Sequence, residues 1–232
     1  MEIISNVHRV PGVDGANVYL LLDETLTLVD TGMPRSAATI LEYIRSLGRA
    51  PTDLTRILLT HHHIDHVGGL AKLKRQTGAT VLAHPDDAPF IASEQPPPLP
   101  HGIVMRLIFR VMSLVFHAEP VSVDVLIEES QTLDVLSGVT IVHAPGHTSG
   151  SIALYVPAER LLISGDAINR RGNRLGLPPK PFTQDMEQAV ASIRRLVDLD
   201  FDVLCPGHGD PIVGGAAEQV RAMLREQKGK AV

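Results

Sequence analysis

The stretch from Thr60 to His66, Thr-His-His-His-Ile-Asp-His, holds four histidines and one aspartate within one short turn. It follows the apolar run Arg56-Ile57-Leu58-Leu59, which we expect to form a buried strand ending at Thr60. Side chains two residues apart face the same way in an extended chain. His61 and His63 can therefore bind one metal ion together, whereas His62 should point to the opposite side.

The chain has to turn after this strand, because Asp65 and His66 open a predicted helix from Val67 to Gln76. That turn would carry both side chains toward a second position close to the first. A few histidines surround a zinc ion only partly, so a metal site requires further ligands. The candidates later in the chain are His147, Asp166 and His208.

Each of these three residues follows an apolar, strand-like run and lies among glycines that permit tight turns. The runs are Val139 to His143, Arg160 to Ile163 and Phe201 to Leu204. Loops at strand ends are held by a rigid sheet, which can aim side chains from distant parts of the chain at one point. The sequence therefore predicts one metal site assembled from strand ends.

Four motifs follow one another along the chain: His-x-His-x-Asp-His, Pro-Gly-His-Thr-x-Gly-Ser, Gly-Asp and Pro-Gly-His-Gly. In this order they resemble the metallo-β-lactamase-fold hydrolase superfamily, and the resemblance covers nearly the whole chain. It implies an α+β fold with α/β-type layering, namely a four-layer αββα sandwich. It also implies a dinuclear metal centre along one edge of that sandwich.

The resemblance assigns roles to individual residues. The first metal would be held by His61, His63 and His147, the second by Asp65, His66 and His208, and Asp166 would bridge the two. Asp30, in Leu-Val-Asp-Thr-Gly, resembles an acidic residue that supports the metal loop without binding metal. We expect two divalent ions, with Zn²⁺ first and Fe or Mn as alternatives, because metal availability often decides among them.

Strand and helix patterns fit a sandwich, because each half of the chain contributes strands first and helices afterwards. Further strands are expected at Glu2 to Val10, Asn17 to Leu22, Thr25 to Asp30, Thr80 to Ala83, Val123 to Ile127, Ile152 to Val156 and Arg160 to Ser164. Further helices are expected at Arg35 to Leu47, Asp86 to Ile91, Asp185 to Asp198 and Ala216 to Glu226. His84 follows one of these strands and should face the same edge as the metals.

Length and composition agree with one soluble domain over residues 1–232. A chain with 44% hydrophobic content can bury a sizeable core at this length. The net charge of −5 and the absence of a long Lys/Arg run argue against a nucleic-acid partner. The N-terminus has no signal-peptide pattern, and the single Cys205 excludes an intrachain disulfide. We therefore expect a cytoplasmic protein that acts on a small molecule.

The segment at about 94–120 interrupts this pattern with a Pro-rich entry and an apolar, helix-like run. The apolar run is too short, and too interrupted by Arg106 and Arg110, to cross a membrane. It could form a lid whose Phe109 and Phe116 line a substrate pocket. It could equally form a homodimer contact, or a helix that only covers the core.

The expected chemistry is hydrolysis by a metal-bridging hydroxide, since two nearby cations lower the pKa of water and polarise a substrate oxygen. Asp65 would orient this hydroxide and pass its proton to the leaving group. A lactone or carboxylic ester is the preferred substrate, because one compact domain with an apolar insert suits a small acyl compound. Asn169 and Arg170, close after Asp166, are candidate substrate contacts. Related quorum-sensing lactonases carry Tyr at the position of Asn169.

Two other reactions stay open. One is thioester hydrolysis, as in glyoxalase II enzymes, although their helical C-terminal domain has no counterpart here. The other is iron-dependent oxidoreduction, as in persulfide dioxygenases. A binding module without catalysis is the weakest alternative, because two metals that share seven protein ligands keep open positions.

Overall fold

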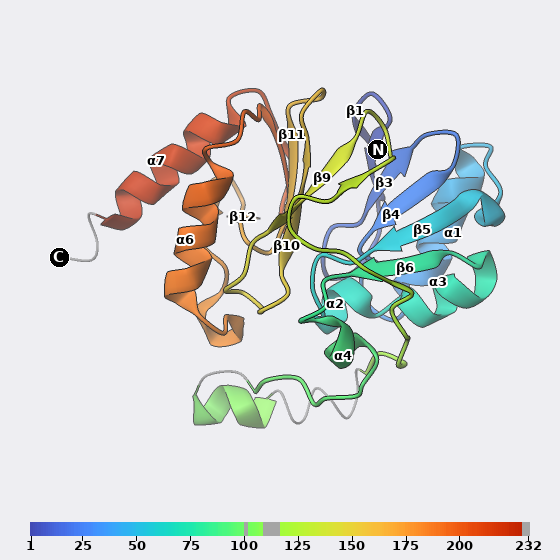
Figure 1. The fold of residues 1–232 in the computed structure, drawn as a ribbon, viewed down its shortest axis with the longest axis horizontal. Coiled ribbons are helices and arrows are strands. Elements are labelled where there is room, and N and C mark those ends of the chain that lie inside the picture. The colour runs from blue at the N-terminus through green and yellow to red at the C-terminus, as the bar shows by residue number, and fades with distance from the viewer. Residues whose placement is uncertain (100–101, 109–116, 229–232) are drawn as a thin grey trace.

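The computed structural model describes residues 1–99, 102–108 and 117–228, and it confirms the expected αββα sandwich (Figure 1). The first sheet contains, in spatial order, β1 (Glu2–Ile4), β2 (Val7–Arg9), β3 (Tyr19–Leu22), β4 (Leu26–Val29), β5 (Leu54–Leu58), β6 (Thr80–Ala83) and β7 (Val125–Leu126). The second contains β15 (Ile212–Val213), β14 (Val203–Pro206), β11 (Leu161–Gly165), β10 (Ile152–Val156), β9 (Val139–His143) and β8 (Thr132–Leu133). A separate hairpin joins β12 (Asn169–Arg171) and β13 (Arg174–Gly176).

Helices cover the outer faces of both sheets (Figure 1). Those on the first sheet are α1 (Ser36–Ser46) and α3 (Leu70–Thr77), and those on the second are α6 (Met186–Leu196) and α7 (Ala216–Lys228), whereas α2 (Ile64–Val67) and α4 (Ala88–Ile91) lie at the lower edge of the view in Figure 1. No helix in the described ranges is long and apolar enough to cross a membrane.

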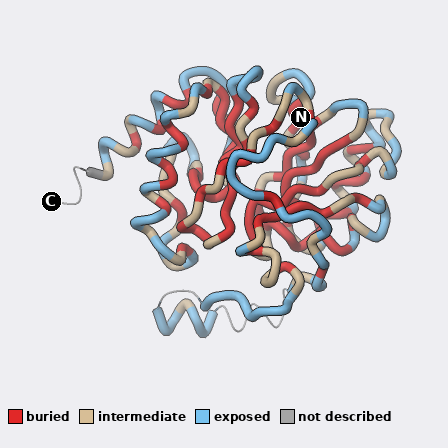
Figure 2. The backbone as a smooth tube through the Cα atoms, viewed as in Figure 1, coloured by how far each residue is buried: buried red, intermediate tan, exposed pale blue. Residues whose placement is uncertain are grey.

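Buried residues run along the strands of both sheets (Figure 2), and the buried apolar side chains form three clusters. In β3, Leu20 belongs to the cluster with α1, whereas Leu21 belongs to the cluster between the sheets. In β10, Leu154 lies between the sheets, whereas Ala153 belongs to the cluster with α6 and α7. A slip of one residue would exchange the two faces of a strand, so this pattern fixes the register.

Strand direction gathers the candidate ligands at one edge. β4, β5 and β6 run parallel, and so do β11 and β14. β9 runs the same way as β11, because both pair antiparallel with β10. The carboxyl ends of these strands therefore meet at one edge of the sandwich. Hydrogen bonds join the sheets there, from Ile152 N–H to Thr60 O (2.9 Å) and from the Tyr19 hydroxyl to Pro206 O (2.7 Å).

Two expected elements are divided in the structure. The strand expected over Glu2 to Val10 is a hairpin of β1 and β2, with Asn6 in a left-handed conformation (φ 64°) at the turn. The helix expected over Val67 to Gln76 is split between α2 and α3 at Gly68 and Gly69. A Cβ on Gly68 would lie 2.5 Å from Pro34 N, so the chain breaks where it packs against an earlier loop.

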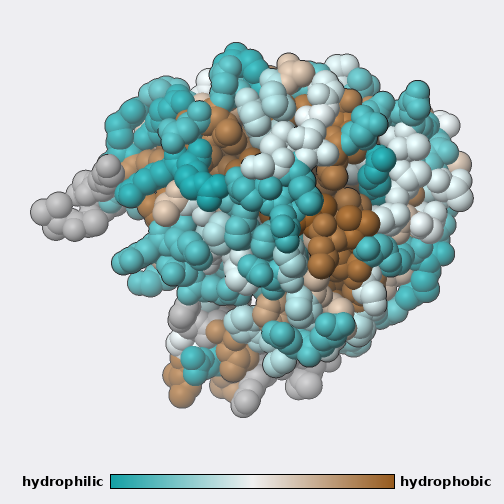
Figure 3. Space-filling model, viewed as in Figure 1, coloured by the Kyte–Doolittle hydropathy of each residue, from teal (hydrophilic) through white to brown (hydrophobic). Residues whose placement is uncertain are grey.

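The helical part of the 94–120 segment lies apart from the sandwich (Figure 1), whereas Glu119 near its end forms an ion pair with Arg75 of α3. Residues 103–108 are helical, and Ile103, Val104 and Leu107 are 85%, 66% and 65% exposed. These apolar side chains do not cover the core, and they are visible as a brown area at the lower edge of Figure 3. Phe109 and Phe116 lie outside the described residues.

Candidate metal centre

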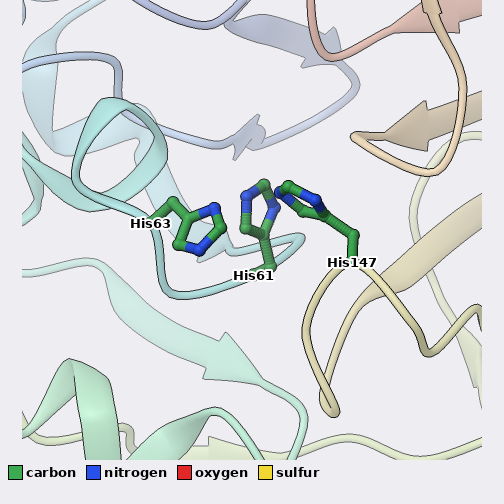
Figure 4. A group of neighbouring side chains, drawn as sticks. All are labelled: His61, His63 and His147. Carbon is green, nitrogen blue, oxygen red and sulfur yellow. The ribbon is translucent and has the colours of Figure 1, made fainter. Parts of the chain in front are cut away.

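The structure brings all seven predicted ligand residues together. His61 and His63 follow β5, Asp65 and His66 lie in α2, His147 lies in the β9–β10 loop, and Asp166 and His208 follow β11 and β14. They form three overlapping groups that could hold a metal, with ligand atoms within 4.8 Å in each: His61, His63 and His147; His61, His66 and Asp166; and Asp65, His66 and His208. Figure 4 shows the first group, in which His147 approaches His61 and His63 from the other sheet.

Three of these imidazoles have one nitrogen held and the other free. The Nε2 atoms of His61, His66 and His147 are buried and form no hydrogen bond. Buried polar atoms in proteins nearly always have partners, so three such atoms facing one place fit an ion better than an apolar cavity. The residues present therefore suit a metal of the kind that binds neutral imidazole.

The Nδ1 atoms of the same residues are oriented by neighbours. Asp30 Oδ2 accepts hydrogen bonds from His66 Nδ1–H and from the Thr60 hydroxyl, both at 2.7 Å. Thr60 thus keeps a lone pair for His61 Nδ1–H, at 3.1 Å. His147 Nδ1 lies 3.3 Å from the Thr183 hydroxyl, which donates to a backbone carbonyl and so accepts from the ring. Such partners select the tautomer that leaves Nε2 able to bind metal.

Asp166 lies between two groups of ligands. Its Oδ1 atom is 3.4 Å from the Nε2 atoms of both His66 and His208, and its Oδ2 atom is 3.4 Å from His147 Nε2. The two oxygens thus face different groups, as a bridging carboxylate requires. Gly207 permits this approach, because a Cβ there would collide with Asp166 Oδ1.

The histidine pKa values differ between the group of His61, His63 and His147 and the group that contains His66 and His208. Burial lowers the pKa of His61 and His63 well below the usual value and the pKa of His147 to about 4. Burial also opposes the charge of His208, but its hydrogen bonds to Asp166 and Asp65 outweigh burial and raise its pKa to about 9. Burial opposes the charge of His66 as well, but the carboxylates of Asp30, Asp166 and Asp65 outweigh it and hold its pKa well above the usual value. Metal ligands must be deprotonated. The three-histidine group is therefore ready to bind, whereas His66 and His208 must each first release a proton.

Comparison with known proteins identifies the family. The model of the metallo-beta-lactamase superfamily matches residues 11–208. The chain belongs to the metallo-β-lactamase superfamily.

Several members of this superfamily are similar over most of the chain. The probable metallo-hydrolase YflN of Bacillus subtilis (strain 168) is 29% identical, over 92% of this chain and 87% of its own. A hydroxyacylglutathione hydrolase of Pseudomonas aeruginosa is 32% identical over 72% of this chain, but only 52% of its own length. The crystal structure of a metallo-beta-lactamase family protein from Thermus thermophilus has a TM-score of 0.74 at 23% identity, covering 98% of this chain and 81% of that one.

The two predicted substrate contacts, Asn169 and Arg170, have different surroundings. Asn169 is buried, and its Oδ1 atom forms no hydrogen bond. The Arg170 guanidinium donates to the carbonyls of Asp210 and Pro211, both at 3.1 Å, and to Asn173 Oδ1 at 2.7 Å. Arg170 is thus engaged in holding a loop, and substrate contact by either residue stays a prediction.

His84 lies beside another histidine rather than among the predicted ligands. Its ring stacks on His143, with centroids 4.1 Å apart and an interplanar angle of 9°. With Asp86 the pair forms a further group that could hold a metal. The Asp86 N–H donates to His84 Nδ1 at 3.2 Å, so Nε2 is the nitrogen of His84 that could bind a metal without disrupting this bond.

Two residues that contact the ligand loops, Thr183 and Asp87, are absent from the sequence-based predictions. Thr183 is buried 36 positions beyond His147, and no motif marks it. Asp87 follows β6, so its place at the ligand edge of the sheet was a usable signal.

Proposed function

We propose that this chain is a metal-dependent hydrolase that holds two divalent ions and cleaves a lactone or carboxylic ester. The observation that carries the proposal is the set of buried, unpaired Nε2 atoms around a carboxylate that faces two ligand groups. A named metallo-hydrolase, YflN, aligns with nearly the whole chain and supports the assignment.

The ligand sets are those that the family resemblance implies, and two of the three groups of neighbouring ligand atoms support them. His61, His63 and His147 would hold one ion, Asp65, His66 and His208 the other, and Asp166 would contact both. When bound, two such ions supply Lewis acidity and make water acidic enough to act as a nucleophile near neutral pH. Zinc is the first choice for a set of histidines and carboxylates, and iron and manganese are the alternatives.

Asp65 is the residue that we assign to proton movement. Its side chain is 30% exposed, whereas that of Asp166 is 5% exposed, so Asp65 is the carboxylate that an incoming substrate can reach. Burial raises the pKa of Asp65, but the charge of His66 and a hydrogen bond from His208 outweigh it and leave the pKa at about 2. Asp65 is thus ionised near neutral pH. A carboxylate with so low a pKa does not retain a proton, so we assign it the roles of orienting the attacking water and passing the proton on to the leaving group.

The acyl substrate is inferred from the candidate ligands and from an apolar segment that lies apart from them. A buried, mainly uncharged histidine group suits a neutral ester carbonyl. The exposed apolar side chains of residues 103–108 would contact an acyl chain only by moving toward the centre (Figure 1). Phe109 and Phe116 of the same segment stay candidate contacts. Thioester hydrolysis is the second candidate, because the hydroxyacylglutathione hydrolase aligns with 72% of the chain.

Proton release by the zinc-loaded protein tests the proposal. The panel contains acyl lactones, aryl esters, glutathione thioesters and phosphodiesters, each with a chelator-treated control that is later reloaded with zinc. We expect lactones or esters to be hydrolysed fastest, with activity lost on chelation and recovered on reloading. Preference for thioesters would replace the substrate class. Inactivity on the whole panel by protein shown to hold two ions would refute the hydrolase and direct attention to oxygen uptake by the iron-loaded form.

A further inference from the structure

Asp87 is a fully buried carboxylate that lies between two ligand loops from different sheets. It follows β6, directly before α4, and is 0% exposed. Within the described residues, all the hydrogen bonds that its carboxylate accepts come from the β5–α2 loop and the β9–β10 loop. The first loop carries His61 and His63, and the second carries His147. Asp87 therefore connects the two loops that would supply the ligands of one metal ion.

On the first loop, the contact is with the residue between two predicted ligands. His62 N–H donates to Asp87 Oδ2 at 2.8 Å, and His62 Nδ1 lies 3.0 Å from the same oxygen. The His62 ring also packs against Phe90 of α4, with centroids 4.6 Å apart. These contacts hold the peptide and the ring of His62 in place. Because side chains alternate in an extended chain, they also direct the side chains of His61 and His63 to the opposite side.

On the second loop, the contacts flank His147. The Thr148 hydroxyl donates to Asp87 Oδ2 at 2.8 Å, and Gly150 N–H donates to Oδ1 at 2.9 Å. Gly150 permits this approach, because a Cβ there would lie 2.6 Å from Asp87 N and Oδ1. Ser151 lies 2.8 Å from the Thr148 hydroxyl and can donate to it, which leaves the Thr148 proton for Asp87.

A carboxylate is required at this place, because donors meet both of its oxygens. Oδ1 faces the N–H of Gly150, and Oδ2 faces the N–H of His62 and the hydroxyl of Thr148. An amide has one acceptor oxygen, so Asn would turn its own NH2 group toward a buried backbone N–H. A buried donor without a partner is costly, and the loops would have to separate to relieve it.

We propose that Asp87 is a positioning residue that holds His147 at binding distance from His61 and His63, and so sets the affinity of one metal position selectively. The proposal rests on the proposed dinuclear centre. Within the described residues, the hydrogen bonds of Asp87 reach none of Asp65, His66 and His208, so the second position does not depend on it directly.

The test compares four variants with the wild-type chain. Asp87→Asn removes the carboxylate, Thr148→Val removes one donor at nearly constant shape, and Thr148→Ser keeps that donor. Asp202→Asn is the matched control, because Asp202 also accepts a backbone N–H between two segments, at the opposite end of β14. Zinc per chain and the affinity of each position are measured by competition with a chromophoric chelator, and folding is checked by thermal melting.

Loss of a group that orients a metal ligand through hydrogen bonds typically lowers the metal affinity 10–100-fold. We therefore expect one position to weaken about 10–100-fold in Asp87→Asn and Thr148→Val, while the other is unchanged. Thr148→Ser and Asp202→Asn should match the wild-type chain.

The variants His147→Ala and His208→Ala serve as references for the loss of the first and second metal positions. The cobalt spectrum of Asp87→Asn should resemble that of His147→Ala.

Each other outcome is decisive. Wild-type affinities in a folded Thr148→Val variant would overturn the proposal, even if Asp87→Asn does not fold. Equal weakening of both positions, or weakening in Asp202→Asn, would show a general loss of structure and also overturn it. A wild-type chain that binds no divalent ion would refute the proposed function as well, whereas two wild-type ions with unaffected variants would refute the role of Asp87 alone.

Discussion

Replacement of Asp30 by Asn should weaken both the fold and the metal centre, although the side chain keeps its shape. Asp30 is 2% exposed and has a positive φ of 61°, a conformation that Asn tolerates, so the substitution adds no backbone strain. Its carboxylate accepts Thr60 N–H (2.8 Å) on Oδ1, and the Thr60 hydroxyl and His66 Nδ1–H on Oδ2. Any change in stability should therefore come from these hydrogen bonds.

The magnitude follows from the donors that the amide cannot satisfy. With the amide oxygen at the Oδ2 place, Thr60 N–H faces an NH2 group, and an unpaired buried donor costs about 1–3 kcal/mol. The two remaining bonds lose their charge assistance, which about doubles the strength of a hydrogen bond, at a further cost of about 1–2 kcal/mol together. The free energy of unfolding should thus fall by about 2–5 kcal/mol. His66 loses its orienting anion, so the affinity of its metal position should fall about 10–100-fold.

Urea unfolding of the metal-free protein and chelator competition on the loaded protein measure these two effects. Asp185→Asn is the control, because Asp185 caps α6 by accepting Gln188 N–H at 2.9 Å and Asn caps helices equally well. A folded Asp30→Asn variant with wild-type unfolding energy and metal affinity would show that the Asp30 contacts neither stabilise the loop nor orient His66.

Three further predictions concern the same centre. Asp166→Ala should lose both ions and all hydrolysis, and metal analysis that still finds two ions would contradict the bridging role. The pKa of His208 is raised from 6.5 to about 9, so its contribution to the stability of the metal-free protein should be complete below pH 6.5 and lost as the pH rises through about 9. Urea unfolding across that range should show the decline, and a flat profile would count against it. Gly207→Ala should reduce metal occupancy, because its Cβ would meet Asp166, whereas Gly176→Ala, with open space around it, should not.

The sequence predicted the parts of the structure that depend on short, local patterns. β5, β9 and β14 lie at the expected apolar runs, and α1 and α6 lie within one or two residues of the expected helices. The candidate ligand residues were identifiable because each stands in a distinctive motif in the chain that follows a strand.

Features determined by distant contacts could not be predicted in this way. The division between α2 and α3 depends on the Thr31–Pro34 loop, which leaves no room for a Cβ on Gly68 or Gly69. The hairpin of β12 and β13 is polar and lacks the alternation that marks a half-buried strand. Asp87 and Thr183 gain their importance only from loops that the fold brings beside them. Their residue types alone carry no such information.

The boundary between the two sheets also divides the candidate ligands. The first half of the chain contains His61, His63, Asp65 and His66, and the second contains His147, Asp166 and His208. Neither half holds a complete set for either proposed ion, so we predict that metal affinity is coupled to the docking of one half on the other. Two fragments cut in the connection between β7 and β8 should therefore reassociate more tightly with zinc than without it. The metal would then serve as a reporter of assembly as well as a catalyst.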